Sequence, residues 1–277
     1  MSGPGGAEVS GPWDRGPRPT RQPELRLYGL NAVDAVFRHR PQAIRKVYLL
    51  QSRIHALKPL LTWCVQQRVG YRVVDEADLE RLAASSHHEG VVADVLKAEP
   101  LALDAWLDSL AAAAPALAIW LDGVGNPHNF GAILRSAAHF GAAVLLPAGS
   151  ALAVSGAAAR VAEGGAEAVP LVRLPATDAA LARLRQAGFG LAATVVRGGQ
   201  DLFAFDPPPR LVYIMGAEGE GMDPALATAC DRRLSIPGSG AVESLNVAAA
   251  TAVFLARWAS RHPPCVVPAG KAPPPAM

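Results

Sequence analysis

The sequence predicts an α/β protein made of two compact units, and three observations support this prediction. The 277 residues are 51% hydrophobic and 18% charged, which provides enough apolar material for a core. Short apolar runs typical of strands alternate with helical patterns over residues 25–261. Both ends are rich in proline and glycine, so we expect flexible tails at residues 1–24 and 262–277.

The first unit is expected over residues 25–97 as a small α/β domain. A helix at 31–37 precedes a strand at 46–50, and a further helix beginning at Asp75 has acids in its first turn, where they oppose the helix dipole. The other expected elements are a helix at 54–67 and strands at 71–74 and 90–95. We expect residues 98–115 to form a linking helix.

The second unit is expected over residues 116–261. Its predicted strands lie at residues 116–121, 142–146, 169–172, 191–196, 211–215 and 233–236. Its predicted helices lie at residues 129–140, 178–186, 224–230 and 244–260. Short apolar strands separated by helices predict a buried, mostly parallel sheet with helices on both faces. Ligands of such sheets bind beyond the carboxyl ends of the strands, so the loops there are the place to look for chemistry.

Composition excludes several classes of protein. Lys and Arg total 26 against 24 Asp and Glu, so no overall field marks a bulk polyanion binder. The three cysteines, Cys64, Cys230 and Cys265, are widely spaced, which argues against a zinc site or a disulfide framework. The longest apolar run, residues 110–121, is too short to span a bilayer, and the N-terminal residues, rich in Gly and Pro and without an apolar core, are not expected to be a secretory signal. We therefore expect a soluble, cytoplasmic protein without a membrane partner.

Three strand-end loops have unusual sequences. The first, residues 121–141, places Asn129 where a helix would be capped and Arg135 six residues later. The second, residues 214–222, is rich in glycine but matches neither the dinucleotide-binding fingerprint nor the phosphate loop with its lysine. A nucleotide-dependent oxidoreductase is therefore disfavoured. The third loop, residues 236–250, runs into the last predicted helix.

In this order, the three loops resemble the signature of the SpoU/TrmH family of RNA ribose 2′-O-methyltransferases, within the SPOUT class. The resemblance covers residues 28–261, and the stretches from Tyr28 to Val33 and from His87 to Val92 resemble the family's RNA-binding domain. It implies a trefoil knot in the second unit, S-adenosylmethionine as cofactor, and a homodimer with each site near the subunit interface. It also implies structured RNA, either tRNA or rRNA, as substrate.

The resemblance also implies roles for individual residues. Arg135 matches the catalytic residue, and a set of polar side chains supports it: Asn129, Glu218, Ser244 and Asn246. Five residues match the cofactor site: Met215, Gly216, Ala217, Ile236 and Leu245. No metal is implied, because the sulfonium methyl group is already activated. The three loops are expected to converge on one pocket.

Each role has a plainer alternative. Asn129 and Ser244 are also ordinary helix caps, Glu218 a solvated loop acid, and Ile236 and Leu245 core residues. A guanidinium is a poor base because its pKa lies above about 12, so Arg135 is better suited to holding a phosphate and orienting the hydroxyl. A protein that binds RNA without turnover is the alternative for the whole chain.

The sequence departs from the family pattern in places, and its RNA surface is less clear. Glu163 stands where many members have a serine, and Ala248 replaces a second serine in the third loop. Residues 28–98 hold ten Lys and Arg against seven Asp and Glu. Four of these cations cluster around one helix–strand connection: Arg38, Arg40, Arg45 and Lys46. They mark either a phosphate-binding patch or an ordinary solvated face.

Overall fold

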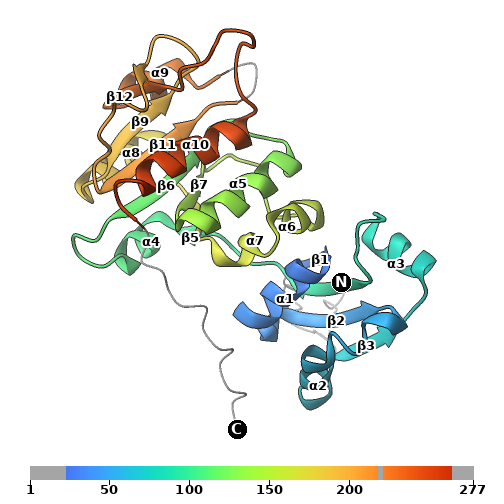
Figure 1. Cartoon of the computed structure of the whole chain (residues 1–277). Coiled ribbons are helices and arrows are strands. Elements are labelled where there is room, and N and C mark those ends of the chain that lie inside the picture. The colour runs from blue at the N-terminus through green and yellow to red at the C-terminus, as the bar shows by residue number, and fades with distance from the viewer. Residues whose placement is uncertain (1–22, 218–220, 264–277) are drawn as a thin grey trace, which may run out of the picture.

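The computed structural model describes residues 23–217 and 221–263, and it confirms the α/β fold (Figure 1). A four-stranded sheet with order β1-β4-β2-β3 forms the N-terminal unit. An eight-stranded sheet with order β10-β12-β9-β11-β6-β7-β8-β5 forms the larger unit. The predicted tails lie mostly outside the described residues, and the trefoil knot remains a prediction.

The N-terminal unit follows the predicted alternation and adds one strand. Its elements are β1 (Glu24–Tyr28), α1 (Leu30–His39), η1 (Pro41–Ala43), β2 (Ile44–Leu49), η2 (Gln51–Arg53), α2 (Lys58–Gln66), β3 (Gly70–Val73), α3 (Glu76–Ala83) and β4 (Val91–Leu96). The sequence did not predict β1, which pairs antiparallel with β4. Asp75 caps α3 by accepting a hydrogen bond from the Asp78 backbone N–H, so the helix begins one residue after the predicted start.

The larger unit contains the remaining elements. They are β5 (Leu101–Ala102), α4 (Leu103–Ser109), β6 (Ala116–Leu121), α5 (Pro127–Phe140), β7 (Ala143–Leu146), α6 (Gly156–Ala162), α7 (Gly165–Ala168), β8 (Leu171–Arg173), α8 (Thr177–Gln186), β9 (Gly190–Thr194), β10 (Gln200–Asp201), β11 (Arg210–Met215), α9 (Pro224–Ala229), β12 (Arg232–Ser235) and α10 (Val247–Ala259). All of its strand pairings are parallel, as predicted. The strand β11 lies between β9 and β6.

Apolar side chains on the two faces of the large sheet build two core clusters. On β6, Ile119 belongs to the cluster under α5 and α10, while the next residue, Trp120, belongs to the cluster under α4, α8 and α9. This alternation follows from strand geometry, in which successive side chains point to opposite faces. Figure 1 shows α5 and α10 side by side on one face of the sheet. The prediction of helices on both faces is therefore confirmed.

The structure differs from the predicted elements in several places. The helix expected over residues 98–115 is only α4, and Trp106 on α4 packs into the core of the larger unit. The helix α5 begins at Pro127 with Asn126 as its N-cap, so Asn129 does not cap it. The helix α10 begins at Val247, capped by Asn246, so Ser244 precedes the helix. Among residues 23–217 and 221–263, no helix is both long and apolar enough to cross a membrane.

Candidate functional site

A cavity of about 130 Å³ lies at the carboxyl ends of β6 and β11. The two strands are parallel neighbours in register, with Leu121 opposite Met215, so the loops that follow them leave the sheet side by side. The cavity is lined by Gly123, Val124, Gly125, Asn126, Asn129, Ala217 and Val247. These residues come from the loop after β6, the first turn of α5, the loop after β11 and the start of α10. Parts of all three unusual loops therefore converge, as expected.

Two asparagines join the helices beside this cavity. The Nδ2 of Asn246 donates a hydrogen bond to the Oδ1 of Asn129, at 3.0 Å. The Oδ1 of Asn246 accepts from the backbone N–H of Ala248 at 2.9 Å, which caps α10. The side-chain oxygen of Asn246 therefore caps α10, and its side-chain nitrogen binds Asn129 of α5.

Backbone hydrogen bonds join two described residues of the segment after β11, Ala217 and Gly221. The backbone N–H of Ala217 donates to the carbonyl of Gly221 at 2.9 Å, and the N–H of Gly221 donates back to the carbonyl of Ala217 at 3.0 Å. A Cβ built on Gly216 would lie 2.6 Å from backbone atoms of Gly221 and Met222. Only glycine therefore fits at position 216 without moving this loop. Met215 is buried at the end of β11, and the predicted site residue Glu218 lies outside the described residues.

The third loop contributes less contact than expected. Ile236 is half-buried and packs against the core cluster under α5 and α10. Ser244 is exposed, and Leu245 is 47% exposed although it is apolar. Neither residue lines the cavity that contains Asn129.

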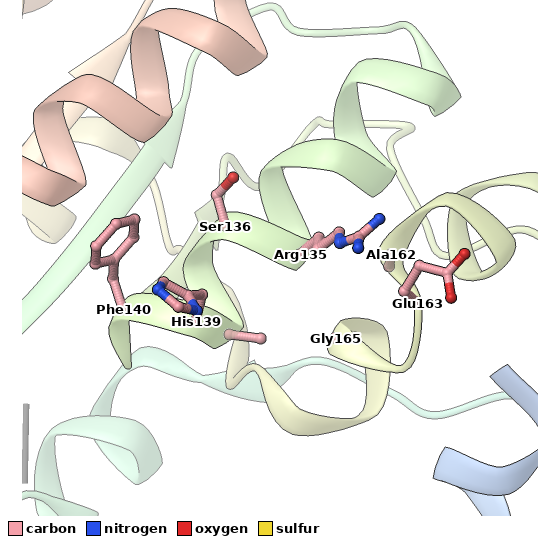
Figure 2. Close-up of a pocket in the computed structure, with 8 residues that line it drawn as sticks. Arg135, Ser136, His139, Phe140, Ala162, Glu163 and Gly165 are labelled. Carbon is pink, nitrogen blue, oxygen red and sulfur yellow. The ribbon is translucent and has the colours of Figure 1, made fainter. Parts of the chain in front are cut away.

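Arg135 lies on a second, larger cavity of about 380 Å³ (Figure 2). It is lined by Arg135, Ser136, Ala138, His139, Phe140, Ala162, Glu163 and Gly165. Six residues along an α-helix move a side chain about 9 Å along the axis and roughly 120° around it, which separates Arg135 from Asn129. Within this chain, the structure brings Asn129 and Asn246 together and places Arg135 on a neighbouring cavity.

The second cavity differs from the smaller one in having two charged side chains, Arg135 and Glu163, in its lining. Figure 2 shows the Arg135 side chain extending from α5 toward the turn between α6 and α7, which carries Glu163. The pKa of the Glu163 carboxyl is lowered, first by a hydrogen bond from Asn31, then by Arg160, and further by the positive charge of Arg135. Burial of this carboxyl acts in the opposite direction. Glu163 is therefore a carboxylate at neutral pH.

Several residues at these cavities did not appear among the predicted site residues. Asn126 and Val247 line the smaller cavity. The sequence could have predicted Asn126 as the start of a helix, because a polar residue followed by proline is typical of that position. Glu163 differs from the serine that many family members have at this position, and the sequence predicts no role for it. Across the described residues, no group of three or more His, Cys, Asp or Glu side chains is arranged to hold a metal ion.

The four cations of the predicted basic patch differ in their contacts. Arg38 pairs with Asp34 at 2.6 Å, and Arg40 pairs with Glu167 of α7 at 2.6 Å. Arg40 therefore contributes to the contact between the two units. The other three, Arg38, Arg45 and Lys46, are exposed and stay candidates for an RNA phosphate, since an ion pair on an exposed helix surface is weak.

The family models match both units. The model of the SpoU rRNA methylase family matches residues 116–256, and a model described as RNA 2′-O ribose methyltransferase substrate binding matches residues 26–101. A protein of Escherichia coli O157:H7, named as the uncharacterized tRNA/rRNA methyltransferase YfiF, is 38% identical over 87% of this chain and 69% of its own length. The 23S rRNA (guanosine-2′-O-)-methyltransferase RlmB of Ralstonia nicotianae is 39% identical over 83% of this chain and 92% of its own.

Solved structures share the fold. An AdoMet-bound rRNA methyltransferase from Sinorhizobium meliloti superposes with a TM-score of 0.71 at 23% identity, covering 87% of this chain and 88% of that one. The SpoU methyltransferase AviRb from Streptomyces viridochromogenes, in complex with AdoMet, also gives 0.71, at 24% identity over 86% of this chain and 90% of that one. With a family model that covers the larger unit and relatives that align along most of the chain, the chain belongs to the SpoU rRNA methylase family.

Proposed function

We propose that this protein transfers the methyl group of S-adenosylmethionine to a ribose 2′-hydroxyl in structured RNA. The observation that carries the proposal is the meeting of three loops at one cavity, with Asn246 of the third loop bonded to Asn129 of the first. The relatives named RlmB support the reaction type, because their names specify guanosine 2′-O-methylation of 23S rRNA. They also favour ribosomal RNA over tRNA as the substrate.

The residues at the smaller cavity fit one part of the cofactor, because a cavity of about 130 Å³ is smaller than the roughly 300 Å³ at which pockets for whole ligands of this size begin. Val124, Ala217 and Val247 provide apolar walls, and the glycines of the loop after β6 let backbone amides and carbonyls come close to a ligand. We assign the holding of the donor to this cavity together with the end of β11 and the segments that follow β11 and β12, through five residues: Met215, Gly216, Ala217, Ile236 and Leu245. When bound, S-adenosylmethionine supplies a methyl group already activated by the positive sulfonium.

The side chains of the protein must position the RNA, and the proton that the 2′-hydroxyl loses needs an acceptor. We assign to Arg135 the binding of a phosphate next to the target sugar, because its exposed guanidinium lines the larger cavity. Such a grip orients the 2′-hydroxyl, and the proton leaves to a phosphate oxygen or to water, since a guanidinium remains charged. Glu218 and Ser244 stay in the proposal as supporting polar groups.

We further propose that the protein works as a homodimer. The helices α5 and α10 pack against each other, and both begin at the smaller cavity. A partner seated on the outer surfaces of these helices would lie next to both cavities. Sedimentation analysis of the full chain tests this proposal, which requires a species of twice the 28.8 kDa chain mass.

A methylation assay tests the proposed function. Purified protein is incubated with labelled S-adenosylmethionine and separate pools of ribosomal RNA and tRNA, and incorporation into ribosomal RNA is expected. Arg135→Ala should abolish incorporation. Arg261→Ala is the matched control, because Arg261 is also an exposed arginine but pairs with Asp206 outside both cavities.

The same assay identifies the alternative. If the wild-type protein binds cofactor and RNA but labels no pool, it is an RNA-binding protein without turnover. Mapping 2′-O-methylated nucleotides in RNA from cells that lack the protein would then identify, or exclude, a cellular target.

A further inference from the structure

The two units of the chain are joined by a set of ion pairs between α6–α7 and the N-terminal unit. Arg40 of the N-terminal unit binds both carboxylate oxygens of Glu167 on α7, at 2.6 and 2.8 Å. The two side chains are only 18% and 9% exposed. Arg160 on α6 donates to Glu89 of the N-terminal unit at 2.8 Å. Bidentate and partly buried pairs of this kind fix orientation as well as distance.

Glu163 occupies the centre of this contact. Its carboxylate accepts hydrogen bonds from Asn31 of α1, in the N-terminal unit, and from Arg160 of α6. Its backbone has a φ of 51°, in the left-handed region, at the end of α6. Glycine adopts this conformation at lower cost, so the side-chain contacts of Glu163 offset a local strain.

The same carboxylate also faces the arginine assigned to RNA binding. Glu163 and Arg135 line the same cavity of about 380 Å³, from α5 on one side and the α6–α7 turn on the other. Figure 2 shows the Arg135 guanidinium on the side of the cavity nearest Glu163. The Glu163 side chain is 22% exposed, so its charge is only partly screened by water.

We propose that Glu163 is a positioning residue that couples the N-terminal unit to Arg135. Asn31 and Arg160 hold the carboxylate in place, and the carboxylate in turn restricts where the Arg135 guanidinium rests in the cavity. Docking of the RNA-binding unit and alignment of the arginine thereby depend on one side chain. This inference rests on the proposed function for its kinetic consequence, but not for the placement of Arg135.

Steady-state kinetics test the coupling. Glu163→Gln keeps the size of the side chain and removes its charge, and we expect kcat to fall about tenfold, less than the roughly 100-fold that a misplacement of about 1 Å can cost. The dissociation constant for S-adenosylmethionine, measured by calorimetry, should stay within about twofold of wild type. Glu163→Asp, which restores the charge, should recover part of kcat.

Glu167→Gln is the matched control. It removes a charge from the same contact between the units, but Glu167 does not line the cavity of Arg135. We expect it to raise KM for RNA or lower thermal stability while leaving kcat unchanged. An equal loss of kcat in both variants, or no loss in Glu163→Gln, would overturn the proposal.

A second measurement does not depend on turnover. In a 15N-labelled protein, the Nε–Hε resonance of Arg135 can be assigned by its absence from Arg135→Lys. We expect this resonance to shift in Glu163→Gln and to stay in place in Glu167→Gln. An unshifted resonance in Glu163→Gln refutes the positioning role even if no RNA substrate is found. A shifted resonance in a protein that methylates no RNA refutes the proposed function instead.

Discussion

Gly216 provides the most direct test of the proposed cofactor site. In Gly216→Ala, the new Cβ would lie 2.6 Å from the carbonyl carbon of Gly221 and 2.6 Å from the nitrogen of Met222, whereas ordinary contacts begin at 3.4 Å. Both opposing atoms belong to the backbone, so no side chain can rotate away. The backbone at Gly221 and Met222 must therefore move by nearly an ångström.

The size of the effect follows from this overlap. Forcing one extra methyl group into a filled site costs about 1–3 kcal/mol. If the loop has to recover its original shape to hold the donor, the cost appears in binding, where about 1.4 kcal/mol corresponds to a factor of ten. Affinity for S-adenosylmethionine should therefore fall between about 5-fold and about 140-fold.

Isothermal titration calorimetry of the full chain measures this loss directly. Gly149→Ala is the matched control, because it places the same methyl group in another loop where nothing lies within 4 Å. We expect Gly149→Ala to bind the donor as the wild type does. A Gly216→Ala protein that binds within twofold of wild type would refute the reasoning, since the tight turn at Gly221 would then have no part in the site.

Four further predictions follow from the packing and the titrating groups. Gly131→Ala places a Cβ 2.5 Å from the carbonyl oxygen of Ala158, so α5 and α6 must separate and the unfolding free energy should fall by about 1–3 kcal/mol in urea titrations; an unchanged midpoint would contradict the close approach. Asn246→Ala removes the cap of α10, and thermal denaturation should report a loss of about 1 kcal/mol, whereas Asn246→Asp, which keeps the acceptor, should lose less. Burial raises the pKa of the Cys64 thiol to about 11, so alkylation of Cys64 at about pH 8, followed by peptide mass analysis to separate it from Cys230 and Cys265, should be slow until the protein unfolds, and rapid labelling of Cys64 in the native protein would show that the site opens. Because the folded-state pKa of Glu163 is lowered, the stabilisation that Glu163 contributes is present above the ordinary carboxyl pKa and is lost as the pH falls through the lower, folded-state pKa; Glu163→Gln should flatten the acid side of the stability profile below about pH 5, and an unaltered slope would argue against the lowered pKa.

Strands buried on both faces were the easiest elements to predict from the sequence. The strand β6 has the predicted bounds, 116–121, because six consecutive apolar residues identify a strand covered by helices on both sides. Two elements of only two residues, β5 and β10, have no periodicity to detect. The strand β1 was missed because it follows a proline-rich stretch and depends on pairing with the distant β4.

Helix starts show why local patterns are ambiguous. Asn126 and Asn129 are both suitable caps, and Pro127 decides between them because proline fits the first turn of a helix. The helix α10 begins at Val247 and not at the predicted residue 244, because the side chain of Asn246 accepts hydrogen bonds from the backbone N–H groups of the first turn.

The candidate site could be predicted loop by loop but not in its full geometry. The order of the loops and the carboxyl ends of parallel strands were enough to bring Asn129, Ala217 and Asn246 together. The position of Arg135 depends on the rotation of α5 and on the packing of α6, neither of which the loop sequences specify. Glu163 appeared only as an unusual residue, since its partners Asn31 and Arg160 meet it through the contact between the two units.

The position of β11 has a consequence for the synthesis of this protein. Its two neighbours, β9 and β6, both precede it in the sequence, and the other partner of β9 is the later strand β12, so β9 cannot pair into the sheet until β11 has left the ribosome. Until then, β6 exposes one edge and β9 exposes both edges with unpaired backbone groups, the kind of edge that promotes aggregation. A nascent chain that stalls before residue 210 is therefore a stronger substrate for chaperones than its hydrophobic content alone would indicate.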